Sequence, residues 1–257
     1  MQALRSGPLA KGSLRMVRGT RGSKGLGWYQ RYIKLGPAAF LKAAPPTPFD
    51  WDVDADGRES DKEGMSEGRR RQRKKAFFEM SVDGVDAGRV EFELASDVLP
   101  VTCENFLRLC HGVPLPTYGP DNLPYDGMVE KVEGGKLCYA GTKIHHITKG
   151  MGIMGGDVEH KNGGWSHSSF QARYFPDEAF LIPHSTSGLL TMANSGVHRN
   201  GSQFFITVEP AGHLDGRSVA FGRVSSGMNV VKALYGMFST KGRPVSNILV
   251  ARCGEVG

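Results

Sequence analysis

The residues of this 257-residue chain that are best able to do chemistry are its eight histidines and four cysteines. His145 and His146 are adjacent, but they fall in a segment that we expect to be a strand, where neighbouring side chains point to opposite faces. No cysteine or carboxylate stands at a spacing typical of metal ligands. The GSKG run at 22–25 lacks the preceding strand and the spacing of a phosphate-binding loop. The sequence therefore predicts neither a metal site nor a cofactor.

The cysteines also say what kind of protein this is. The four are Cys103, Cys110, Cys138 and Cys253. They contain no CxxC pair and are too sparse for a disulfide-built scaffold, so neither a zinc finger nor a small secreted domain is indicated. Hydrophobic burial must hold the fold. No run approaches the roughly 18 consecutive apolar residues of a membrane-spanning helix, so no membrane span is predicted.

The net charge of the chain is +6, but the charged residues are unevenly distributed along it. Residues 1–49 carry nine basic residues and no acidic one, whereas residues 50–68 carry eight acidic and two basic residues. The RRRQRKK run at 69–75 then adds six positive charges, and the remainder is mildly acidic. This pattern predicts an N-terminal extension over 1–75 and a globular domain over 76–257.

The extension has several interpretations. An acid-free segment rich in Arg, Ser and Gly is typical of an organelle transit peptide, which favours a mitochondrial protein. A retained basic arm would instead bind RNA or an acidic protein surface, and RRRQRKK resembles a nuclear-localisation cluster; nuclear and cytoplasmic locations are the alternatives. The aromatic residues between 28 and 51 indicate either docking on the partners of a multi-subunit assembly or packing against the chain's own domain.

The globular part begins with alternating hydrophobic residues. Residues 76–82 and 90–94 predict a β-hairpin around a Val-Asp-Gly turn. A helix is predicted from Pro100 to Gly112, with proline in its first turn, and a second helix over 228–238. Short strands such as GLLTMAN, SQFFITV and SVAFGRV lie between the helices. Many short strands with two helices suggest a closed antiparallel barrel capped by helices.

Several stretches in order then resemble the cyclophilin family: ENFLRLC, GGD at 155–157, FPDEAF, GLLTMANSG, NGSQFFIT and LDGRSVAFGRV. The resemblance covers about residues 76–257. It implies a mainly β fold, an eight-stranded antiparallel β-barrel capped by two α-helices, with a peptide groove on its outer face. It also implies an activity, cis/trans isomerisation of the bond before proline in a peptide, without a cofactor.

The resemblance also assigns site residues, some of which match the family and some of which differ. Aligned on GGD, the family motif FHRIIPGFMxQGGD reads IHHITKGMGIMGGD, so His146 stands at the catalytic arginine position. The substrate-binding positions are Met151, Met154, Asn194, Gln203, Phe205, His213, Leu214 and Ser218. Of these, Asn194, Gln203, Phe205 and Leu214 match, whereas Met154 replaces the carbonyl-binding glutamine and Met151 and Gly152 replace the pocket Phe and Met. His213 replaces a tryptophan, and Ser218 replaces a histidine.

These changes predict little or no isomerase activity and a binding or structural role; an active isomerase is the alternative. The resemblance places His213, Asp215 and Ser218 on one surface loop, so we do not interpret them as a hydrolytic triad. The 113–141 loop is longer than in the family and is either a plain insertion or a partner-binding surface. Some divergent-loop members carry a cysteine pair at the positions of Cys110 and Cys253, which would allow a redox switch, although free thiols are favoured in a reducing compartment.

Overall fold

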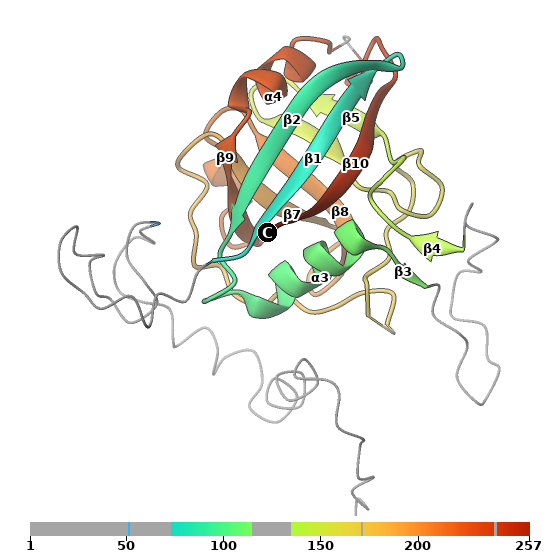
Figure 1. Cartoon of the computed structure of the whole chain (residues 1–257). Helices are drawn as coiled ribbons and strands as arrows, with labels where there is room; N and C mark the ends of the chain where they lie inside the picture. Colours follow the sequence, from blue (N-terminus) through green and yellow to red (C-terminus); the bar gives the residue numbers. More distant parts are fainter. Residues whose placement is uncertain (1–50, 52–72, 115–134, 171, 239–240) are drawn as a thin grey trace, which may run out of the picture.

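The computed structural model describes Trp51 and residues 73–114, 135–170, 172–238 and 241–257. Eight strands form one antiparallel sheet in the order β10-β1-β2-β9-β7-β8-β6-β5 (Figure 1). They are β1 (Lys75–Val82), β2 (Val85–Leu94), β5 (Ile144–Thr148), β6 (Gly152–Gly155), β7 (Leu189–Asn194), β8 (Asn200–Thr207), β9 (Ala220–Ser226) and β10 (Ile248–Val256). Two short strands, β3 (Val113–Pro114) and β4 (Lys136–Leu137), pair separately at the two ends of the predicted insertion.

The two edges of the large sheet come together just before β5. The Gly141 N–H donates to the Val250 carbonyl at 2.7 Å, and the Val250 N–H donates to the Thr142 carbonyl at 2.9 Å. A bridge between Lys143 and Leu249 continues this contact. The helices α3 (Pro100–His111) and α4 (Met228–Tyr235) lie at opposite ends of the curled sheet (Figure 1). The predicted mainly β architecture, eight antiparallel strands with two helices, is confirmed.

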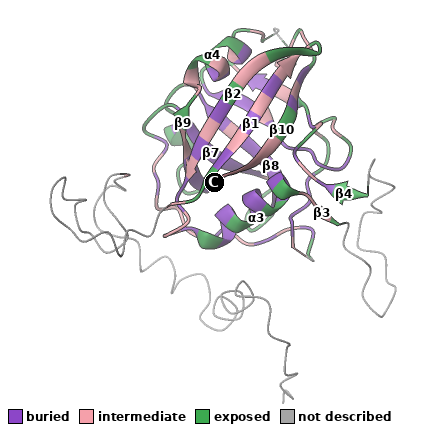
Figure 2. Ribbon diagram, in the orientation of Figure 1, coloured by how far each residue is buried: buried purple, intermediate pink, exposed green. Residues whose placement is uncertain are grey.

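The predicted hairpin is β1 and β2. Its turn contains Asp83 and Gly84, both with positive φ, a conformation that glycine adopts without strain. Along β1 and β2 buried side chains alternate with more exposed ones (Figure 2), because successive residues of a strand face opposite sides of the sheet. The inward set includes Phe78, Val90 and Phe92.

The first helix begins at Pro100 and ends before Gly112, as predicted. Its free N-terminal N–H groups are capped from far along the chain, because Val101 and Thr102 donate backbone hydrogen bonds to the Glu178 carboxylate at 3.0 and 2.8 Å. The second helix is shorter than predicted. It ends at Tyr235, with Gly236 following, and Phe238 forms a bridge with Pro244 instead.

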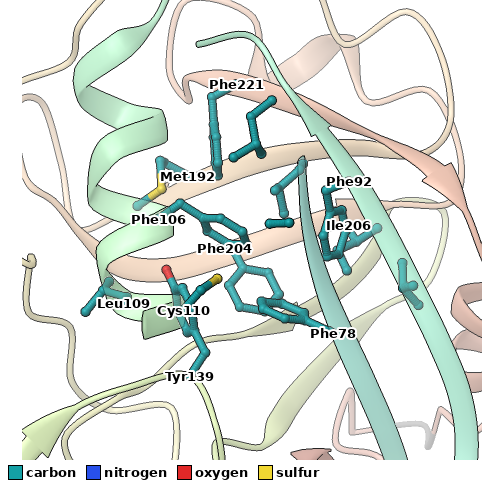
Figure 3. Packing of buried hydrophobic residues seen from close by; sticks show 14 of the residues in the cluster. Phe78, Phe92, Phe106, Leu109, Cys110, Tyr139, Met192, Phe204, Ile206 and Phe221 are labelled. Carbon is teal, nitrogen blue, oxygen red and sulfur yellow. The ribbon is translucent and has the colours of Figure 1, made fainter. Parts of the chain in front are cut away.

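The core is dominated by aromatic side chains from the sheet, α3 and the segment before β5 (Figure 3). Phe78 packs edge-on against Phe92 with ring centroids 5.1 Å apart, and Phe106 lies 5.0 Å from Tyr139. The buried Tyr139 hydroxyl donates to the Ser202 carbonyl at 2.7 Å, which satisfies its hydrogen bond inside the core. This cluster fixes β8 and the approach to β5, the two strands that carry much of the site.

Several sequence predictions concern residues outside the described part of the chain. They are the basic extension apart from Trp51 and residues 73–75, the GSKG run, and the middle of the 113–141 loop. Neither helix in the described ranges has the length and apolar character needed to cross a membrane.

Candidate functional site

Three neighbouring strands bring His146, Met154 and Phe205 into one row. His146 on β5 pairs with Met154 on β6, and Met154 pairs with Phe205 on β8. Each is only partly buried, whereas the flanking residues Ile153 and Phe204 are fully buried. Since alternate residues of a strand face opposite sides, these three side chains lie on the outer face of the barrel. We call them the outer row.

The His146 imidazole lies against the segment that precedes β10. A β-carbon placed on Gly242 would lie 3.0 Å from Nε2 of His146, and the Ile147 N–H donates to the Gly242 carbonyl at 2.7 Å. The side chain paired with His146 is the thioether of Met154. This pair of positions therefore presents neither a guanidinium nor a side-chain amide.

The neighbouring residues Met151 and Gly152 leave little open space. Met151 is buried, and its carbonyl accepts hydrogen bonds from the N–H groups of Val208 and Glu209 at 2.7 and 3.2 Å. At Gly152 a β-carbon would lie 2.9 Å from Cα of Thr207, closer than real β-carbons approach backbone. The backbone of β8 therefore occupies the space that a side chain at Gly152 would need.

Gln203 and Asn194 are present but hold the scaffold. The Gln203 side-chain amide donates to the carbonyls of Gly163 and Trp165 at 3.1 and 2.6 Å, and the residue is buried. The Asn194 amide donates to the Arg217 carbonyl at 2.6 Å, so it joins the end of β7 to the loop before β9. Both side-chain NH₂ groups are thus engaged within the protein.

His213 and Leu214 lie on the short 3₁₀ helix η1 (Gly212–Leu214), where His213 is exposed and Leu214 is half-buried. Ser218 is buried, and its N–H donates to the Leu214 carbonyl at 3.0 Å. The three predicted residues are therefore brought together by one compact loop.

The loop is positioned by a hydrogen-bonded chain that the sequence analysis missed. His184 Nδ1 lies 2.8 Å from the Asp215 carboxylate, and its Nε2 lies 3.1 Å from the hydroxyl of Thr191. The His184 N–H also donates to Asp215 at 2.8 Å. Thr191 on β7 pairs with Phe205 on β8. The hydrogen bonds of His184 therefore connect the loop that contains η1 to β7, the strand beside the outer row. No local pattern could reveal it, because Asp215 lies 31 residues from His184.

The pKa shifts of His184 and Asp215 favour a neutral His184 imidazole and a charged Asp215 carboxylate. Burial lowers the pKa of His184, despite the hydrogen bond to Asp215. Burial alone would raise the pKa of Asp215, but the hydrogen bonds from the backbone and ring of His184 outweigh it and lower that pKa. His184 therefore donates from Nδ1 and accepts the Thr191 hydroxyl proton at Nε2. Asp215 is paired with His184 and not with His213, which also argues against the hydrolytic arrangement.

His145 and His146 contact different segments. Gly163 lies so close to the His145 ring that a β-carbon there would overlap it, whereas the His146 ring lies against Gly242. Burial lowers the pKa of His145. Within the described ranges no group of three or more His, Cys, Asp or Glu side chains is arranged to hold a metal ion.

Trp51 packs against the chain's own barrel. The guanidinium groups of Arg73 and Arg223 lie 5.5 and 5.0 Å from the centroid of its ring. Arg73 also donates to the Trp51 carbonyl at 2.6 Å. The two arginines are held by acids of the barrel, Arg73 by Asp97 at 3.0 Å and Arg223 by Glu93 at 2.9 Å. At this residue the extension docks on its own domain.

Comparison with known proteins agrees with the sequence motifs. A family model described as "Cyclophilin type peptidyl-prolyl cis-trans isomerase/CLD" matches residues 77–255. The chain is 42% identical over 183 residues to the peptidyl-prolyl cis-trans isomerase cyp11 of Rhizopus delemar, which covers 71% of this chain and 50% of that protein.

Two further relatives are each 39% identical over 183 residues, or 71% of this chain. One is the NK-tumor recognition protein of Homo sapiens, of which 12% is covered, and the other is peptidyl-prolyl cis-trans isomerase D of Eremothecium gossypii, of which 46% is covered. The chain thus spans half or less of the length of these curated relatives.

Proposed function

Because the chain belongs to the cyclophilin-type peptidyl-prolyl cis-trans isomerase family, we propose that residues 76–257 form a peptide-binding or structural module with weak or no isomerase activity. The single observation that carries this proposal is the pair of His146 and Met154 in the outer row. These positions correspond to the arginine and glutamine of the family motif.

The chemistry of the reaction explains why this pair matters. Amide resonance gives the prolyl bond a rotation barrier of about 18–20 kcal/mol. A permanently charged guanidinium aimed at the imide nitrogen favours its pyramidal form and lowers that barrier. An imidazole has a shorter reach, and its ordinary pKa leaves it mostly neutral at pH 7. Loss of one preorganised electrostatic group typically lowers a rate by about 10²–10³-fold.

Met154 removes a second interaction. A thioether is at best a weak acceptor and donates no hydrogen bond, so it cannot hold a substrate carbonyl as a glutamine amide does. Met151 is buried, and the backbone of β8 fills the space beside Gly152. Phe205 and Leu214 still offer apolar surface. This combination favours apolar contact with a proline-containing peptide over catalysis on it.

An active isomerase that assists protein folding is the second candidate. Its support is the identity of 42% to a relative named as an isomerase, together with Phe205 in the outer row and Leu214 on the loop tied beside it. In this alternative the slower chemistry at His146 would still suffice for a client.

We further propose that the extension over 1–75 and the 113–141 loop bind proteins of a multi-subunit assembly, with mitochondria as the favoured location and the nucleus or cytoplasm as alternatives. At Trp51 the extension contacts Arg73 and Arg223 of the same chain, so this residue is not offered as part of the partner-binding surface. The nine basic residues of 1–49 also suit RNA as a ligand.

Binding of a proline peptide tests the module. The full chain is titrated with an N-acetyl-Ala-Pro peptide and its NMR shifts are followed. We expect the affinity for the peptide to be about tenfold or more weaker in Phe205→Ala than in the wild type. Val85→Ala is the control, because Val85 is 69% exposed and lies at the β1–β2 turn. Equal affinity in wild type and Phe205→Ala would remove the outer row as the binding surface.

Co-sedimentation tests the assembly. A chain without residues 1–72 should lose its native complex, whereas Trp51→Ala in the full chain should weaken it less. The deletion stops at 72 because Arg73 pairs with Asp97 in the barrel. An unchanged sedimentation profile in the deletion would contradict the scaffold role, and ribonuclease treatment that alone releases the chain would assign the extension to RNA.

A further inference from the structure

Three of the four cysteines meet where α3, β10 and the segment after β4 come together. Cys138 Sγ lies 4.0 Å from Cys253 Sγ. The Cys253 thiol also lies 3.3 Å from the Cys110 carbonyl, and the Cys138 thiol lies 3.9 Å from the same oxygen. All are free thiols in the structure, and Cys103 is apart, with its thiol directed at the Phe221 carbonyl at 3.5 Å.

The surrounding backbone holds Cys138 in this place. The Tyr139 N–H donates to the Leu109 carbonyl at 3.1 Å, next to Cys110. A β-carbon on Gly112 would lie 3.5 Å from Cβ of Cys138, which shows how closely this segment approaches the end of α3. On the other side, Cys253 is fixed by its pairing with Phe78 in the sheet.

Access separates the two possible partners of Cys253. Cys138 and Cys253 are both half-buried, whereas Cys110 is 3% exposed and belongs to the last turn of a helix. A small-molecule disulfide must reach one of the two sulfurs, and in the Cys138–Cys253 pair either sulfur can react first. The two thiols that combine proximity with access are therefore Cys138 and Cys253.

We propose that Cys138 and Cys253 form a disulfide on reaction with a small-molecule disulfide such as oxidised glutathione. One cysteine thiolate attacks the small disulfide, forms a mixed disulfide and releases one reduced thiol. The second cysteine thiolate then attacks the protein sulfur of the mixed disulfide and releases the second reduced thiol. The protein loses two electrons and two protons, and the small disulfide gains them. The pairing differs from the Cys110–Cys253 pair that the family resemblance suggests.

The thiols are set for slow oxidation. The hydrogen bond to Cys253 and burial raise the pKa of Cys138, although the positive charge of Lys136 opposes the shift. The hydrogen bond to the Cys110 thiol is the main cause that raises the pKa of Cys253 to about 12. His111 and Glu255 form an ion pair at 3.7 Å close to this cluster. Because only the thiolate attacks a disulfide, the reaction is slow at neutral pH and accelerates as pH rises.

The disulfide would tie the segment that leads into β5 to the last strand of the sheet. Tyr139, the residue after Cys138, is fully buried in the aromatic core. The same segment leads into β5, which carries His146. The cross-link would close a loop of about 115 residues, which restricts the unfolded chain. The oxidised form should therefore melt roughly 5–10 °C above the reduced form.

Tryptic mapping of the full chain tests the pairing, because trypsin places the three cysteines on separate peptides. Cys138 falls in 137–143, Cys253 in 253–257 and Cys110 in 109–131. After hours with excess oxidised glutathione at about pH 8.5, we expect free thiols to fall from four to two and peptides 137–143 and 253–257 to be joined until reductant is added. A joined pair of 109–131 and 253–257, or four thiols that all remain free or carry glutathione, would overturn the proposal.

Serine variants separate the pairing from general reactivity. Cys110→Ser and Cys103→Ser should keep the cross-link and the rise in Tm, whereas Cys138→Ser and Cys253→Ser should each lose both. Circular dichroism of the reduced proteins checks that each variant folds, and two independent variants on the proposed pair guard against a single misfolded one. A Cys110→Ser chain that no longer cross-links would contradict the assignment.

Discussion

The two faces of β5, β6 and β8 differ in what they do. The inward face carries Ile147, Ile153 and Phe204, all buried in the core. The outward face, one residue away on each strand, carries the outer row of His146, Met154 and Phe205. The inward side chains are apolar and packed as a barrel requires, whereas the outward ones include neither a guanidinium nor a side-chain amide.

Fold and chemistry are specified by different residues of the same strands. Core packing depends on the volume and shape of the inward side chains. Catalysis depends on a few charged or polar groups on the outward side. Because alternate residues face opposite sides, one set can change without altering the other. This separation is why we propose that the chain keeps the cyclophilin barrel with weak or no isomerase activity.

The largest expected effect comes from substituting the neighbours Phe204 and Phe205 in turn. Phe204→Ala should lower the free energy of unfolding by about 3–5 kcal/mol, because it leaves a cavity in the aromatic core. Phe205→Ala should cost less than about 1.5 kcal/mol, because its side chain is only partly buried. Urea unfolding of both variants makes the comparison, and similar losses would show that the two faces are not separate.

Acidification should lower the stability of the native protein through three of its histidines. Burial lowers the pKa of His145, His167 and His184. Below about pH 6.5 the unfolded chain takes up more protons at these residues than the native protein does, so stability falls as pH falls.

From pH 7.5 to 5.5 the free energy of unfolding should fall by at most about 4 kcal/mol, since each of the three histidines contributes at most about 1.4 kcal/mol. The titratable or charged groups nearby are Asp157 and His146 for His145, Glu159 and Arg173 for His167, and Asp215 and His213 for His184. Urea unfolding at the two pH values measures the loss. A stability that is constant or rises toward pH 5.5 would mean that the histidines are charged in the native state.

A smaller effect tests how the inner part supports the outer loop. His184→Ala should cost about 2–3 kcal/mol, because it leaves Thr191 and Asp215 without their partner. His184→Asn retains a donor near the position of Nδ1 and should recover about half of this loss. Chemical unfolding gives the stabilities, and NMR shifts of Leu214 report the loop. If the NMR shifts of Leu214 are unchanged in His184→Ala, the hydrogen bonds of His184 do not position η1.

Local patterns were enough to predict the hairpin, the start of α3 and the strands at GLLTMAN, SQFFITV and SVAFGRV, whereas β6 was not predicted. Each depends on nearby residues, such as Pro100 in the first turn of its helix or the alternation around Phe78. Motif alignment placed His146 opposite the family arginine, and the register of β5 and β6 pairs it with Met154.

Long-range contacts were beyond prediction. The cap of α3 by Glu178 lies 76 residues away, and His184 joins Thr191 and Asp215 only through the fold. Likewise, the sequence shows that Gly152 lacks a side chain but not that the backbone of β8 takes up its space. Such contacts depend on how distant strands meet, which no local periodicity records.

The most direct measurement of the central claim is the catalysed cis/trans exchange rate of an N-acetyl-Ala-Pro peptide. Exchange spectroscopy would compare the wild type, the His146→Arg/Met154→Gln variant and a cyclophilin that has the arginine. Gly152 is left unchanged because a side chain there would meet the backbone of β8. We predict wild-type turnover about 10²-fold or more below that of the cyclophilin, with a substantial part of the rate regained in the double variant. Wild-type turnover close to that of the cyclophilin would contradict the account.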